Sequence, residues 1–269
     1  MSALEACIIG AGVWGPGLEG WAASRLILAG ALPYEPRPSP APPPAILPAT
    51  ERRRAGPVTR LALVVAQEAA ASSGLPPGSL RSIFASSNGD GVVVGSILEA
   101  LATIDAADRP VSPTQFHNSV HNAAAGYWSI ANASAQPATC LGLHDDTWAA
   151  ALLKAVAEIL ADAEPVLLCA YDHPLPAPLD VKRPTLAPFG LGLVLAPPGI
   201  GTPLARLTLH YDAMAGVPPP VPHTEGLRPL ATGNAAARGL PLLEALARGA
   251  LDSHRLPYQD GCLTVTLAP

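Results

Sequence analysis

Residues 146–172 have the sequence DTWAAALLKAVAEILADAEPVLLCAYD, and this stretch decides the fold class. Its first part, 147–160, is rich in strong helix formers, places Trp and Leu on one face, and spaces Lys154 and Glu158 for an i,i+4 ion pair. The continuous apolar run at 166–172 is typical of a strand that is buried on both faces. A strong helix that leads directly into a buried strand indicates an α/β protein.

The same alternation continues on both sides of this stretch. Short apolar runs predict further strands at 5–13, 82–87, 188–197, 205–214 and 262–268. Helical patterns predict helices at 57–73, 92–104 and 240–251. Two proline-rich stretches, 32–50 and 218–222, are predicted to be surface loops rather than domain boundaries. We therefore expect a single α/β domain over 1–269, with a largely parallel or mixed sheet packed between helices.

The composition indicates a chain with much apolar surface to bury. Of 269 residues, 49% are apolar and 14% are charged, and the mean hydropathy is +0.29. Either the core is large or an apolar surface meets a partner. No apolar run reaches the ~18 residues of a membrane span, and residues 1–15 lack the basic start of a secretory signal. We expect no membrane span and a cytoplasmic location.

Charge and cysteine content exclude several classes of function. A net charge of −5 without a long basic stripe argues against nucleic-acid binding. The four cysteines lie far apart and form no C-x-x-C pair, so we expect reduced thiols rather than a zinc site or disulfides. The basic run at 52–54 is interpreted as a solvated loop, with a dock for an acidic partner as the alternative.

Two motifs suggest a cofactor or a metal, and neither is favoured. Residues 10–15 (GAGVWG) match G-x-G-x-x-G after a strand, but a tryptophan stands where phosphates would approach, and the candidate ribose acid Glu35 lies in a proline-rich loop. His117 and His121 could share a helix face, but Asn118 stands where a metalloprotease has its glutamate. We expect no cofactor and no metal, and structural roles for both histidines.

The four residues His144, Asp145, Asp146 and Thr147 immediately precede the strong helix. Aspartates at this position commonly cap backbone N–H groups, and the positive end of the helix stabilises their charge by about 0.5–2 kcal/mol. By itself, the pattern predicts an ordinary helix start.

Six segments, taken in order, resemble the ketoacyl synthase side of the thiolase-like superfamily. They are CIIGAGVWGPG (7–17), RRRAGPVTRLALVVAQEAAASSGL (52–75), SIFASSNGDG (82–91), SPTQFHNSVHNAAAGYWSIA (112–131), the stretch 146–172, and PFGLGLVLAP (188–197). The resemblance is closest to a short ketoacyl-synthase-like family found with aryl polyene pigment clusters, whose members resemble chain-length factors. It implies a thiolase-like layered sheet between helices, with 1–200 as one half of that fold and 201–269 as a shortened remnant of the other.

The departures from this family bear on the function. The resemblance places the nucleophilic cysteine of an active synthase at Asp145, at the start of the strong helix, where the helix end would lower a thiol pKa. Cys140 comes five residues earlier, in a strand-like segment. Neither histidine motif of an active synthase appears after residue 200. Asp145 cannot hold an acyl group as a thioester, so no catalytic residue is expected.

The resemblance therefore implies a non-catalytic chain-length-factor-like subunit. Such a subunit would pair with an active ketoacyl synthase, serve an acyl carrier protein, and help to shape the acyl tunnel at the shared interface. The resemblance implies five interface residues, Phe116, His117, Asn118, Asn122 and Gly126. Trp128 and Trp148 are candidates for setting the tunnel length, with plain core positions as the alternative.

Two other hypotheses stay open at this point. The chain could be a condensing enzyme or acyltransferase, with Cys140 as the acyl acceptor, His144 as its base and Asp145 orienting the imidazole. A cysteine inside a strand, however, lacks the helix-end field that favours a thiolate. The chain could also be a homodimeric module that binds acyl chains or a carrier protein.

Overall fold

The computed structural model describes residues 4–102, 111–213 and 216–269. Its strands are β1 Leu4–Gly15, β2 Leu18–Glu19, β3 Arg81–Ala85, β4 Ala138–Leu141, β5 Val166–Asp172, β6 Phe189–Ala196, β7 Ala205–Asp212, β8 Asp252–Tyr258 and β9 Gly261–Ala268. Its helices are α1 Trp21–Leu28, α2 Ala49–Arg54, α3 Pro57–Ser73, α4 Gly91–Ala102, α5 Pro113–Ser119, α6 Ala123–Asn132, α7 Thr147–Asp162, α8 Arg228–Gly233 and α9 Leu240–Arg248. Parts of two predicted elements, residues 103–104 and 214, lie outside the described residues.

The strands of the described residues form one mixed sheet with the order β4-β3-β5-β6-β1-β7-β9-β8, and β2 pairs with β1. Strand β3 pairs in parallel with both β4 and β5, and the other neighbours are antiparallel. The prediction of an α/β fold with a mixed sheet between helices is confirmed. Strand β5 is buried along its whole length, as its apolar run predicted.

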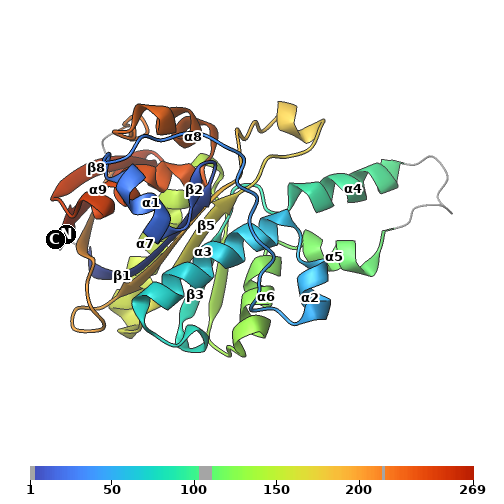
Figure 1. Cartoon of the computed structure of the whole chain (residues 1–269), viewed down its shortest axis with the longest axis horizontal. Coiled ribbons are helices and arrows are strands. Elements are labelled where there is room, and N and C mark those ends of the chain that lie inside the picture. Colours follow the sequence, from blue (N-terminus) through green and yellow to red (C-terminus); the bar gives the residue numbers. More distant parts are fainter. Residues whose placement is uncertain (1–3, 103–110, 214–215) are drawn as a thin grey trace.

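Helices cover both faces of the sheet (Figure 1). One core cluster joins the sheet to α3 and α6, and the other joins it to α7 and α9. The predicted pair Lys154–Glu158 forms on α7. Strands β7, β9 and β8 continue the same sheet beyond β1, so the C-terminal part of the chain packs on α7 and α9 as well.

The glycines of the G-x-G-x-x-G match serve packing rather than phosphate binding. Residues 10–15 all lie within strand β1, so they form no loop at a helix N-terminus. A Cβ atom on Gly12 would lie 2.4 Å from the carbonyl oxygen of Val65, and one on Gly10 would lie 2.2 Å from that of Ala69. The absence of side chains therefore lets α3 rest directly on the sheet.

The interpretation of the basic run 52–54 as a loop is wrong, and the possibility that His117 and His121 share a helix face is not realised. The basic run 52–54 belongs to helix α2 rather than to a loop, and Arg52 donates to the carbonyl oxygen of Leu47 at 2.8 Å. His117 and His121 do not share a helix face, because α5 ends at Ser119. His117 instead packs edge-on against the ring of Tyr127, with 6.0 Å between ring centroids.

Candidate functional site

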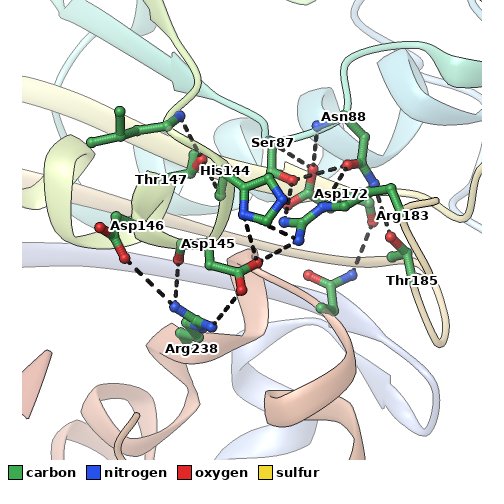
Figure 2. Close-up of polar contacts among 12 residues, drawn as sticks. Ser87, Asn88, His144, Asp145, Asp146, Thr147, Asp172, Arg183, Thr185 and Arg238 are labelled. Carbon is green, nitrogen blue, oxygen red and sulfur yellow. Dashed lines mark hydrogen bonds and ion pairs between the residues drawn. The ribbon is translucent and has the colours of Figure 1, made fainter. Parts of the chain in front are cut away.

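The candidate site lies where the parallel strands β3 and β5 end beside the start of α7. Carboxyl ends of parallel strands meet at one edge of a sheet, which is where α/β folds commonly bind ligands. Asp172, the last residue of β5, accepts hydrogen bonds from Ser86 Oγ at 2.9 Å, from Ser87 N at 2.8 Å and from Asn88 N at 3.0 Å. One carboxylate oxygen therefore organises the loop that follows β3 (Figure 2).

Burial dominates the acidity of Asp172. Burial raises the pKa of this carboxyl from 3.8 to about 6, although the hydrogen bonds from Ser86, Asn88 and Ser87 and the charge of Arg183 oppose the rise. The second oxygen, Oδ2, is buried and has no hydrogen-bond partner in the described structure. A proton on this carboxyl is therefore held more tightly in the folded protein than in the unfolded chain.

Arg183 connects this loop to the start of α7. Its Nη2 donates to Ser87 Oγ at 2.8 Å, and its Nε donates to Asn88 Oδ1 at 3.4 Å. Its Nη1 forms an ion pair with Asp145 Oδ1. Asn88 in turn donates to Thr185 Oγ1 at 2.8 Å and to His173 O at 3.4 Å, so several hydrogen bonds join the segment after β5 to the loop after β3.

Asp145 is held by a second arginine from the C-terminal part of the chain. Arg238 Nη2 lies 3.0 Å from Asp145 Oδ2, and Arg238 Nη1 donates to the backbone oxygen of Asp145 at 2.8 Å (Figure 2). Partial burial opposes ionisation of Asp145, but the hydrogen bond from Arg183 and the charges of Arg238, Arg183 and His144 outweigh it, so the pKa of this carboxyl lies below its ordinary value.

The aspartates do not cap helix α7, contrary to the simple interpretation of the sequence. No side-chain cap hydrogen bond is formed by Asp146, the residue before the helix. Its carboxylate instead accepts the backbone N–H of Gln259 at 2.9 Å. The chain turn before α7 is fixed by Thr147, whose Oγ1 accepts from Leu143 N at 2.9 Å and donates to His144 O at 2.7 Å. Because Thr147 supplies the hydrogen bonds of this turn, the carboxylates of Asp145 and Asp146 can form ion pairs with arginines from distant segments.

The structure separates Cys140 from the residues that would activate it. Cys140 lies on β4 and packs against the cluster under α3 and α6, whereas His144 and Asp145 precede α7, which covers the opposite face. Burial raises the pKa of the Cys140 thiol. His144 Nδ1 lies 3.6 Å from Asp145 Oδ1, so the histidine and the aspartate are brought together without the cysteine.

The five residues implied for an interface divide into exposed and buried ones. Phe116 is 68% exposed, and His117, Asn122 and Gly126 are also exposed. Asn118 is buried, donates to Arg54 O at 3.0 Å and accepts from the Tyr127 hydroxyl at 3.0 Å. Asn118 therefore holds α5 against its neighbours and does not face outward.

Exposed apolar side chains extend the surface around Phe116. They lie on α4, which projects from the sheet together with α5, on the segment just after α5, and on α6, which packs with α3 against the sheet (Figure 1). They are Val92, Leu98, Leu101, Val120 and Ile130. The two tryptophans considered for a tunnel, Trp128 and Trp148, are both 1% exposed and belong to the two core clusters.

A polar pocket of about 380 Å³ adjoins the site and is lined by Ser86, Asn88, His121, His144 and their neighbours. Within the described ranges, no group of three or more His, Cys, Asp or Glu side chains could hold a metal ion. In the same ranges, no helix combines the length and the apolar character needed to cross a bilayer.

Comparison with known proteins gives a consistent result. A family model described as the N-terminal domain of beta-ketoacyl synthase matches residues 29–246. No curated protein matches the chain in sequence.

Solved structures show the same fold. A ketosynthase in complex with its chain length factor from Xenorhabdus doucetiae gives a TM-score of 0.71 over 98% of this chain and 99% of that chain, at 19% identity. A beta-ketoacyl synthase from Burkholderia phymatum STM815 gives 0.69 over 98% of each chain at 12% identity. The ishigamide ketosynthase/chain length factor gives 0.69 over 97% of this chain and 98% of that chain at 14% identity. At these identities, the similarity establishes a shared fold.

Proposed function

The chain belongs to the beta-ketoacyl synthase N-terminal domain family and has a thiolase-like α/β fold, and from this premise we propose that it is a chain-length-factor-like subunit without a nucleophile of its own. It pairs with an active ketoacyl synthase, and the pair extends an acyl chain delivered by an acyl carrier protein. The product is of the aryl polyene type, the location is the cytoplasm, and residues 1–269 act as one domain.

The observation that carries this proposal is the state of Asp145 at the start of α7. The resemblance assigns the nucleophile to this position. Here the side chain is a carboxylate that is neutralised by Arg183 and Arg238. A carboxylate that is fixed by two guanidinium groups is a poor nucleophile, because attack would require loss of both ion pairs. The helix end therefore serves structure, and condensation takes place in the partner.

The arrangement around Cys140 argues against the enzyme alternative. An acyl-accepting cysteine needs a thiolate and a base within hydrogen-bond reach. Burial raises the pKa of Cys140, and the side chain packs under α3 and α6 rather than toward His144. Both observations disfavour a thiolate at neutral pH.

The exposed surface on α4, α5 and α6 favours a protein partner over an isolated monomer. Phe116 is the most exposed of its apolar side chains, at 68%. Clusters of exposed apolar side chains mark interaction sites, and obligate interfaces are more apolar than transient ones. Phe116, Asn122 and Gly126 are our candidates for direct contact with the synthase. Asn118 is buried and supports that surface from behind, whereas His117 is exposed beside Phe116.

A reconstituted condensation assay tests the proposal. The chain is co-purified with the ketoacyl synthase of its own organism and supplied with acyl and malonyl carrier protein. We expect Cys140→Ser to leave the rate of chain extension within about twofold of wild type, like the control Cys7→Ser, because no acyl transfer passes through this thiol. Substitution of the synthase's own cysteine should abolish extension. Loss of extension in Cys140→Ser alone, with the complex intact, would establish the enzyme alternative instead.

A further inference from the structure

A second pocket, separate from the site around Asp145, has the properties of a small-molecule site. Its volume is about 620 Å³, within the ~300–1,000 Å³ that is usual for such sites. Its walls are the proline-rich segment 36–41, the first turn of α3, and the two ends of the segment between β5 and β6. We propose that this pocket binds an amphipathic monocarboxylate, an apolar chain or ring with one carboxylate group. The inference does not depend on the proposed function.

The proline-rich wall is rigid because it is tied to the β1–β2 hairpin. Trp14 Nε1 donates to Ser39 O at 2.9 Å, and Gly17 N donates to Arg37 O at 3.0 Å. Ser39 Oγ donates to Glu19 Oε1 at 2.8 Å. In Figure 1 the segment runs past α3 toward α2 without helix or strand. Prolines restrict the backbone further, so the pocket exists before any ligand arrives and little ordering entropy opposes binding.

Charge at the pocket favours an anion. Of the described residues that line it, two are arginines and none is Asp or Glu. Arg37 is paired with Glu19 at 3.3 Å. Arg60 uses its Nε to donate to Ala55 O at 2.9 Å, and within the described residues its terminal nitrogens have no acidic partner. The guanidinium of Arg60 is thus fixed in direction and able to receive a carboxylate in a bidentate contact.

The other residues that line the pocket are mostly apolar, and they indicate the chemistry of the part of the ligand that carries no charge. Prolines contribute most of it, together with Leu61, Leu186 and Ala187. Such walls offer contact area and few hydrogen-bonding groups, which suits an alkyl chain or an aromatic ring. A compact polar anion such as phosphate would leave most of this surface unused. Among the described residues that line the pocket, Arg60 offers a cation without an acidic partner, and together with the apolar walls it selects an amphipathic acid.

Isothermal titration calorimetry with decanoate tests the proposal on the full-length chain. The matched ligand is decyltrimethylammonium, which has the same alkyl chain and the opposite charge. We expect saturable binding of decanoate with one site per chain, at least about tenfold tighter than binding of the cation, because a charge-assisted hydrogen bond is worth roughly a factor of ten or more. Absence of decanoate binding, or equal affinity for both ligands, overturns the proposal without any variant.

Variants then locate the binding site. Arg60→Gln is expected to weaken decanoate by about tenfold or more while leaving the weak binding of the cation unchanged. Ala41→Phe, which fills the pocket, should abolish binding of both ligands. Arg53→Gln removes the same charge from an exposed position on α2 outside the pocket and should have no effect. Decanoate binding that survives both Arg60→Gln and Ala41→Phe would place the ligand elsewhere and overturn the assignment. Circular dichroism verifies that each variant is folded.

Discussion

Replacing Asp172 by asparagine removes the ionisable group at the centre of the loop after β3. Burial raises the pKa of Asp172 from 3.8 to about 6, so the folded protein binds this proton more tightly than the unfolded chain does. The resulting stabilisation is fully present below the unfolded pKa and is lost as the pH rises through about 6. The difference between the two pKa values corresponds to about 3 kcal/mol. Of this stabilisation, about 2 kcal/mol is lost when the pH is raised from 4.5 to 7.5.

Urea unfolding of both proteins at these two pH values measures the effect. Asparagine keeps one oxygen as the acceptor for Ser86, Ser87 and Asn88, so the substitution removes the charge with little change in the loop. We expect the unfolding free energy of wild type minus that of Asp172→Asn to be about 2 kcal/mol larger at pH 4.5 than at pH 7.5. Asp180→Asn, at an exposed position on the following segment, is the control. A difference that stays constant, or that grows toward pH 7.5, refutes the reasoning.

Three further substitutions test other parts of the structure. Asp145→Asn removes the anion that two mostly buried arginines share and, within the described residues, leaves Arg238 only its 3.8 Å ion pair with Asp146. After allowing for the partial exposure of Asp145, we expect a loss of about 1–2 kcal/mol, and thermal denaturation should show a Tm lower by about 2–4 °C. Gly12→Ala forces α3 away from the sheet and should cost about 1–3 kcal/mol in urea unfolding, whereas Gly126→Ala, where a Cβ atom meets nothing within 4 Å, should not. Burial lowers the pKa of His254 from 6.5 to about 4, so the stability that this neutral imidazole contributes at higher pH is lost as the pH falls through this range. In His254→Leu, the unfolding free energy should therefore decrease by about 3 kcal/mol less than in wild type between pH 7 and pH 4. An unchanged acid dependence would contradict the burial of this imidazole.

Much of the fold follows from local sequence patterns. The helix α7 and the strand β5 lie where residues 146–172 predict them, because each pattern matches its period over many residues. Strand β8 has no such signal: it pairs with β9 at the edge of the sheet, contains Pro257, and buries only Leu256 fully. Edge strands with polar side chains resemble loops in sequence, so only the pairing with β9 reveals it.

Only part of the site could be predicted from the sequence. Asp145 stands out because it precedes a strong helix, but its partners Arg183 and Arg238 come from distant segments, the latter 93 residues away. No spacing rule connects such residues. The sequence also does not reveal that Asn118 is buried. The resemblance implies an interface role, yet the side chain is buried by contacts with Arg54 and Tyr127 that depend on how α5 packs.

The most direct test of the central claim is native mass spectrometry of the chain co-expressed with the ketoacyl synthase of its own organism, after incubation with acyl carrier protein. The account predicts a one-to-one complex in which the acyl group is found on the synthase and the mass of this chain is unchanged. A homodimer of this chain with an acyl group on Cys140 would contradict it.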